Sequence, residues 1–104
     1  MPRRLVGGSG AAQGTVVKAA LTEYRITLSP TPAAPGLYTF VATNRGAAVH
    51  ALEVVGPGGT QRTPDLGAGQ SARFTVRLAS GSTDVFCPVG THKELGMDLE
   101  LTIP

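Results

Sequence analysis

Short runs in which bulky apolar residues alternate with polar ones, each bounded by glycine or proline, constrain this chain more than any other feature. In residues 23–29, Tyr24, Ile26 and Leu28 alternate with polar neighbours, and residues 71–78 repeat the pattern. Alternation with a period of two buries one face of a β-strand and leaves the other in water. Further runs of this kind cover residues 15–21, 37–44, 49–56, 83–87 and 98–103. Because no run is long enough for three helical turns, the pattern predicts an all-β antiparallel sandwich or barrel of about seven strands.

The length and composition fit a single packed domain. The chain has 104 residues, of which 41% are hydrophobic and 15% are charged, and it has one cysteine, so an internal disulfide is excluded. Residues 1–14 lack periodicity and apolar bulk. We interpret them as a flexible arm, a linker or a cloning remnant, and we expect the domain to cover residues 15–104.

The charge distribution excludes a nucleic-acid partner. The formal net charge of +2 disappears when Arg3 and Arg4 are set aside, so the domain has no basic excess. No run approaches the roughly 20 apolar residues of a membrane span. We expect a monomer that binds no nucleic acid.

The residues that can bind a metal fall into one pattern. Cys87, His92 and Met97 follow one another at intervals of five residues, and His50 lies 37 residues before Cys87. Two imidazoles, a thiolate and a weak thioether are typical of a trigonal copper site with a long axial bond. Zinc prefers a tetrahedron of imidazoles and thiolates and makes little use of methionine. The sequence therefore predicts one copper site.

With these residues in view, the chain resembles the cupredoxins, the small blue copper proteins, over residues 15–103. The resemblance lies in the ligand loop 87–97, whose spacing is similar to that of rusticyanin, and in residues 21–26, 36–44 and 66–71. It implies a Greek-key sandwich of eight strands, so that one further strand lies within residues 57–70. It also implies that His50, Cys87, His92 and Met97 hold one type 1 copper.

The resemblance further implies a docking surface for redox protein partners. In cupredoxins the histidine of the ligand loop lies near the surface inside an apolar patch. Electrons are therefore expected to pass through His92, and the patch predicted around it consists of Pro35, Leu37, Val49, Val89 and Leu95.

Two functions remain open at this point. The same ligands suit an electron carrier that cycles between Cu(II) and Cu(I), and they suit a copper carrier or buffer that delivers the metal. A copper enzyme of this fold needs further histidines, and both histidines of the chain belong to the predicted site.

Copper chemistry indicates a periplasmic, extracellular or envelope location, where the arm at residues 1–14 stands in for a removed signal or serves as a membrane tether.

Overall fold

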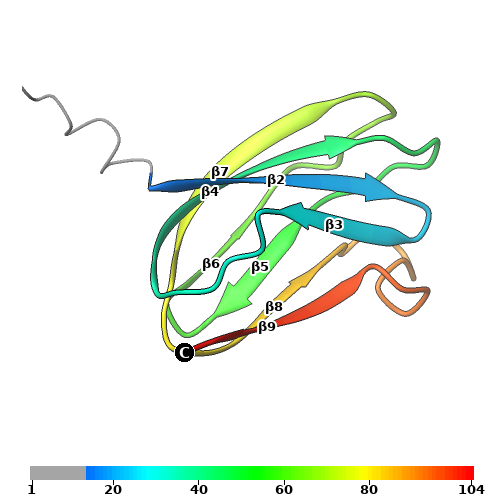
Figure 1. Ribbon diagram of the computed structural model, residues 1–104. Coiled ribbons are helices and arrows are strands. Elements are labelled where there is room, and N and C mark those ends of the chain that lie inside the picture. The colour runs from blue at the N-terminus through cyan, green and yellow to red at the C-terminus, as the bar shows by residue number, and fades with distance from the viewer. Residues whose placement is uncertain (1–13) are drawn as a thin grey trace, which may run out of the picture.

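The computed structural model describes residues 14–104 and contains eight strands in two four-stranded sheets (Figure 1). The first sheet has the order β3-β2-β4-β7, with bounds Arg25–Ser29, Thr15–Thr22, Gly36–Asn44 and Ser71–Leu78. The second has the order β6-β5-β8-β9, with bounds Gly59–Arg62, Glu53–Gly56, Gly81–Phe86 and Asp98–Ile103. The predicted all-β class is confirmed. The arm predicted over residues 1–14 lies outside the described residues, except for Gly14.

The two sheets bury one face each against the other. Neighbouring strands are antiparallel except for β2 and β4, which run parallel from the Thr15–Tyr38 pair to the Leu21–Asn44 pair. The alternation of the sequence appears as alternating burial, and the largest fully buried apolar side chains include those of Phe40, Leu21, Leu52, Leu78 and Ile103. No helix in the described part of the chain is long and apolar enough to cross a bilayer.

Residues 49–56 differ from the single strand that their pattern predicts. Strand β5 begins only at Glu53, because the preceding backbone bonds outside its sheet. His50 forms an isolated antiparallel bridge with Leu66, and the Leu52 amide donates to the Thr63 Oγ1 at 3.1 Å. The additional strand expected within residues 57–70 is present as β6, which pairs with β5.

One end of the sandwich collects the segments that carry the predicted ligands. Strands β4 and β8 end there and β9 begins there, joined to β8 by the turns of residues 89–96. Figure 1 shows this loop at the right, with the C-terminus at the opposite end of the sandwich.

Candidate metal centre

Three side chains that can bind a metal ion converge at this end. His50, Cys87 and His92 each offer one ligand atom, and these atoms lie within 4.8 Å of one another. The Nδ1 atoms of the two histidines are 3.2 Å apart, and the Cys87 Sγ lies 3.6 Å from the His92 Nδ1. His50 and Cys87 are fully buried, whereas His92 is partly exposed. The group is therefore open to solvent through His92.

The loop after β4 fixes the position of His50. The buried Asn44 side chain donates from Nδ2 to the carbonyls of Ala48 and Leu66, at 2.8 and 2.9 Å. Its Oδ1 accepts the Gly46 amide at 2.8 Å, which makes a tight turn directly after the strand. The His50 amide donates to the Leu66 carbonyl at 3.0 Å, and the Leu66 amide donates back at 2.7 Å. Side-chain and backbone bonds together hold this ligand segment.

Glu23, in the turn between β2 and β3, holds the imidazole of His50. Its Oε1 accepts from the His50 Nε2 at 2.6 Å, and the carboxylate also accepts the amides of Ala48 and Ala47, at 2.9 and 3.2 Å. The hydrogen bonds from the Ala48 and Ala47 amides, followed by the one from the His50 side chain, lower the pKa of Glu23 from 4.5 to about 2. An ionised carboxylate only accepts, so Nε2 carries the proton of the neutral ring. The Nδ1 lone pair of His50 is thereby left for a metal.

The same turn contacts both ligand loops. A Cβ on Gly46 would lie 2.2 Å from the Glu23 Oε1, so glycine is required for this approach. The Tyr24 ring packs against that of His92, with centroids 5.2 Å apart. Gly96 has φ +131°, and a Cβ there would lie 2.8 Å from the Tyr24 carbonyl oxygen. The turn thus supports His50 on one side and the His92 loop on the other.

Backbone hydrogen bonds close the ligand loop on itself. The Leu95 amide donates to the Thr91 carbonyl at 3.2 Å and closes one helical turn within the loop. The Met97 amide donates to the His92 carbonyl at 3.1 Å, and the Cys87 amide donates to the Met97 carbonyl at 3.0 Å. Met97 is fully buried and belongs to the same core cluster as Cys87. The Met97 backbone therefore links the backbones of the two predicted ligands Cys87 and His92.

The donor set fits a copper ion. Metal bonds of about 2.0 Å to imidazole nitrogen and about 2.3 Å to thiolate sulfur hold such donors roughly 3 to 4 Å apart. The observed separations of 3.2 and 3.6 Å fall in this range. Two imidazole nitrogens with one thiolate, and a buried methionine in the same loop, match the preference of copper for soft sulfur ligands.

Solved structures with a similar arrangement of strands include small copper proteins. Auracyanin from the photosynthetic bacterium Roseiflexus castenholzii has a TM-score of 0.73 and 19% identity, over 88% of this chain and 98% of its own. Auracyanin A, a blue copper protein from Chloroflexus aurantiacus, has a TM-score of 0.65 and 14% identity, over 86% of this chain and 98% of its own. The chain has the cupredoxin fold. No protein-family model matches its sequence. No curated protein matches it either.

The cupredoxin fold also occurs within a larger enzyme. A multicopper oxidase from Campylobacter jejuni has a TM-score of 0.63 and 10% identity, over 88% of this chain but only 30% of the oxidase chain. The chain thus corresponds to nearly the whole of an auracyanin and to less than a third of the oxidase.

Three residues of the predicted docking patch lie near the segments that carry the predicted ligands. Val49 immediately precedes His50 and is 44% exposed, and Leu95 of the ligand loop is 54% exposed. Val89 is partly buried and packs against the core, and its carbonyl accepts the His92 amide at 3.1 Å. These three residues give the site end an apolar rim, which we call the loop patch.

Pro35 and Leu37, also predicted for that patch, lie at the other end of the sandwich. Leu37 is the second residue of β4, and the strand runs seven residues further to Asn44 before it reaches the site. At about 3.3 Å per residue this places Leu37 roughly 23 Å away along the strand. The expectation that these two residues surround His92 is therefore wrong, because it did not account for the direction of β4.

The sequence patterns did not indicate that Glu23 and Asn44 support the site. The alternation over residues 23–29 predicts that Glu23 lies on the solvent face of a strand, but β3 begins only at Arg25. No local signal marks Glu23, because its bond to His50 joins residues 27 positions apart. Asn44 did have a local signal, since asparagine two residues before glycine at a strand end favours a turn closed by its side chain.

Proposed function

We propose that this protein is a type 1 copper electron-transfer protein. It moves single electrons between redox protein partners while one bound copper alternates between Cu(II) and Cu(I). The observation that carries the proposal is the convergence of the His50 Nδ1, the Cys87 Sγ and the His92 Nδ1 in a cupredoxin fold. Residues 15–104 form the copper-binding domain, in which Met97 would be a fourth, weak ligand beside His50, Cys87 and His92.

The surroundings of the ligands suit repeated electron transfer. The bound metal would supply the redox chemistry, and the chain supplies a site that changes little between oxidation states. Glu23 fixes the ring of His50, and the Met97 backbone fixes the spacing between Cys87 and His92. Burial of Cys87 and of Met97 keeps water from the sulfur donors, which disfavours the more highly charged cupric state. A comparatively high reduction potential follows.

His92 is the port through which electrons enter and leave. It is the partly exposed member of the ligand group, and the loop patch of Val49, Val89 and Leu95 lies beside it. A small apolar surface around an exposed ligand favours weak, short-lived complexes with partner proteins. We place the protein in the periplasm, on the cell surface or outside the cell, where few thiols compete for copper.

The protein acts as a carrier of electrons and not as an enzyme. Catalytic copper centres in this fold need further histidines, and both histidines of this chain belong to one site. The fixed loops also favour permanent retention of the metal over its delivery to another protein.

Copper retention distinguishes an electron carrier from a copper carrier. The copper-loaded protein is mixed with an excess of a cuprous or cupric chelator, and metal loss is followed by absorbance. An electron carrier retains copper for hours and shows a reversible one-electron wave in voltammetry. Loss within seconds, without a reversible wave, would identify a copper carrier instead.

A further inference from the structure

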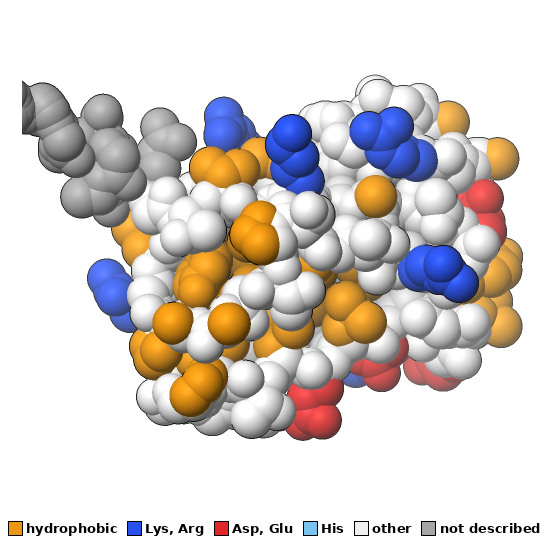
Figure 2. Space-filling view, in the orientation of Figure 1, with side chains coloured by type: hydrophobic (Ala, Val, Ile, Leu, Met, Phe, Trp, Pro, Cys, Tyr) orange, Lys and Arg blue, Asp and Glu red, His pale blue; other side chains and the backbone are white. Residues whose placement is uncertain are grey.

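Positive charge is concentrated on the outer face of the β3-β2-β4-β7 sheet. Five of the nine Lys and Arg residues lie on this face, and none of the seven Asp and Glu residues does. We call it the basic sheet face, and its cations are Lys18, Arg25, Arg45, Arg73 and Arg77. The outer face of the other sheet carries instead Glu53, Asp84, Asp98 and Glu100. Figure 2 shows Lys and Arg side chains over the first sheet and most of the acidic ones along the lower edge.

The strand register arranges the basic sheet face in rows. Lys18 pairs with Val41, which pairs with Arg73, so these two cations flank one apolar residue. At the site end of the face, Arg25 follows the β2–β3 turn and Arg45 follows β4. Between these two sets of cations lies a row of small side chains, which we call the small-residue row and which consists of Thr27, Ala20, Thr43 and Ser71.

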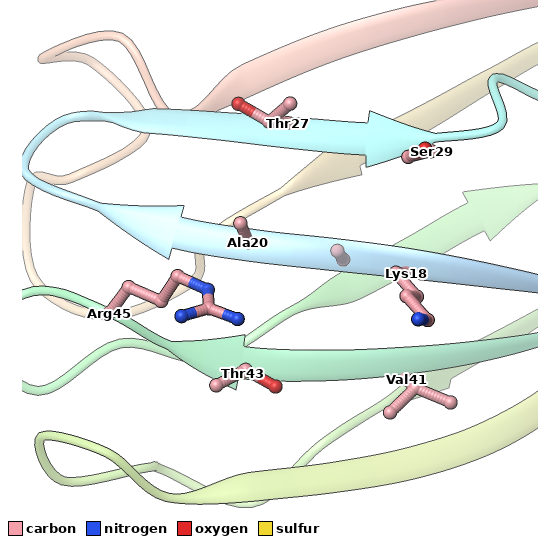
Figure 3. A pocket seen from close by; sticks show the side chains of 8 residues that line it. Lys18, Ala20, Thr27, Ser29, Val41, Thr43 and Arg45 are labelled. Carbon is pink, nitrogen blue, oxygen red and sulfur yellow. The ribbon is translucent and has the colours of Figure 1, made fainter.

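The small-residue row forms a hollow bordered by cations. A shallow depression of about 340 Å³ is lined by Lys18 and Arg45 together with Thr27 and Thr43, among others. Figure 3 shows Lys18 and Arg45 on either side of the position of Ala20 and Thr43. The hydroxyls of Thr43 and Ser71 bond to each other at 2.8 Å, and this pair retains one hydrogen for a further acceptor. Cations and hydroxyl donors around a shallow hollow suit a phosphate group.

The charge of this face is not neutralised within the molecule. The ion pairs of the described residues join Glu23 with His50 and Arg62 with Asp65, so none involves a cation of the basic sheet face. Without Arg3 and Arg4 the basic and acidic residues balance. Attraction to an anionic surface would therefore come from the separation of charge and not from an overall excess.

We propose that the basic sheet face docks onto an anionic phospholipid bilayer, with lipid phosphates seated along the small-residue row. Stable protein interfaces usually contain aromatic anchors, and no aromatic side chain of the described residues lies on this face. An anionic bilayer requires only basic residues spread over a surface, which is the pattern observed. The ligand loop lies at the end of the strands, so a docked molecule keeps His92 uncovered. The inference does not rest on copper binding.

Sedimentation with lipid vesicles tests this proposal. The full chain is mixed with vesicles of phosphatidylcholine alone, or with about one-third phosphatidylglycerol, at low salt and at about 0.5 M salt. Binding is expected only to the anionic vesicles and only at low salt. The variant Lys18→Gln/Arg45→Gln should bind roughly 30-fold more weakly, because each basic residue near the surface contributes separately.

A matched control separates the face from the net charge. Thr60→Glu/Thr102→Glu changes the net charge by the same amount at exposed positions of the other sheet. Its affinity for anionic vesicles should fall by less than about threefold. Circular dichroism verifies folding, and Arg73→Gln/Arg77→Gln replaces the first variant if that one does not fold. The proposal is overturned if the wild type does not bind anionic vesicles, or if both charge variants weaken binding equally. It is also overturned if millimolar inorganic phosphate displaces the protein from vesicles. The same holds if the wild type binds an acidic protein but does not bind anionic vesicles.

Discussion

Glu23 shows how one surface carboxylate can orient a buried histidine that is a predicted copper ligand. It is about one-third exposed, yet it accepts hydrogen bonds from two loop amides and from the fully buried His50 ring. The loop amides keep the carboxylate ionised, and the ionised carboxylate selects the His50 tautomer with Nδ1 free. A residue outside the predicted ligand set thus determines which nitrogen of His50 is free to bind a metal.

The lowered pKa of Glu23 predicts a pH dependence of stability. Its pKa is about 2 in the folded chain against 4.5 when unperturbed, so the stabilisation is fully present above pH 4.5 and is lost as the pH falls towards 2. In urea unfolding of the copper-free protein at pH 7, the midpoint concentration of wild type should lie well above that of Glu23→Gln. The difference between the two midpoints should be smaller at pH 3. Glu94→Gln controls for net charge, since no hydrogen bond of Glu94 is found among the described residues. An equal gap at both pH values would contradict this role.

Met97 has a structural role through its backbone, and its side chain can be tested separately. Leucine has a similar volume and fills the same buried position, so Met97→Leu should keep the fold and the coloured site. Removal of the thioether withdraws a donor that stabilises Cu(II), so the reduction potential should rise, whereas Met97→Gln should lower it. Voltammetry of the three proteins measures this order. If all three potentials agree, Met97 is a core residue and not a ligand.

Among the elements, the turn between β2 and β3 contacts both loops of the site. It contributes Glu23 to the His50 loop and Tyr24 to the His92 loop, although it donates no ligand itself. Its contact with the ligand loop depends on Gly96, where φ is +131° and the Tyr24 carbonyl is close. The turn and both loops are therefore expected to behave as one mechanical unit.

Two glycines of the ligand loop test this dependence. Gly96→Ala combines a backbone conformation unfavourable to alanine with a contact of 2.8 Å, so it should cost at least about 2 kcal/mol of unfolding free energy and weaken copper binding. Gly90→Ala is the matched control, because φ is +52° there and nothing lies within 4 Å of a Cβ. Gly90→Ala should lower the free energy of unfolding by about 1 kcal/mol. Denaturant unfolding and copper titration provide both readouts, and equal effects of the two changes would show that the Tyr24 contact is unimportant.

Local periodicity was sufficient to predict most elements but not the support of the site. Strands β2, β4, β7 and β9 lie within a residue of the runs read from the sequence, because each run buries alternate side chains. The unusual ligand residues were also recognisable by type and spacing. The positions of Glu23 and Leu37 relative to the site were not predictable in this way, because they depend on which strands run side by side and in which direction. The pairing of β4 carries Leu37 away from His50 and brings Asn44 towards it.

At the scale of the whole molecule, the two ends of the sandwich have different roles. The site end presents Val49 and Leu95 to solvent, while Leu37 lies at the far end of β4. If partners dock at the site end, Leu95→Asp should slow electron self-exchange by at least about tenfold at low salt, with partial recovery in high salt, because it brings like charges together. Leu37→Asp adds the same charge at the other end and should have little effect. Line broadening in proton NMR of mixed oxidation states measures the rate, and equal rates in both variants would exclude His92 as the port.

The most direct test of the central claim is a titration of the copper-free protein with Cu(II), followed in the visible spectrum. The convergence of the Cys87 Sγ with two histidine Nδ1 atoms predicts one equivalent of copper per chain and an intense blue or green thiolate charge-transfer absorption. Cys87 is the single cysteine of the chain, so Cys87→Ser should remove the colour completely. Colour that persists in Cys87→Ser, or copper binding by the wild type without colour, would contradict the type 1 copper assignment.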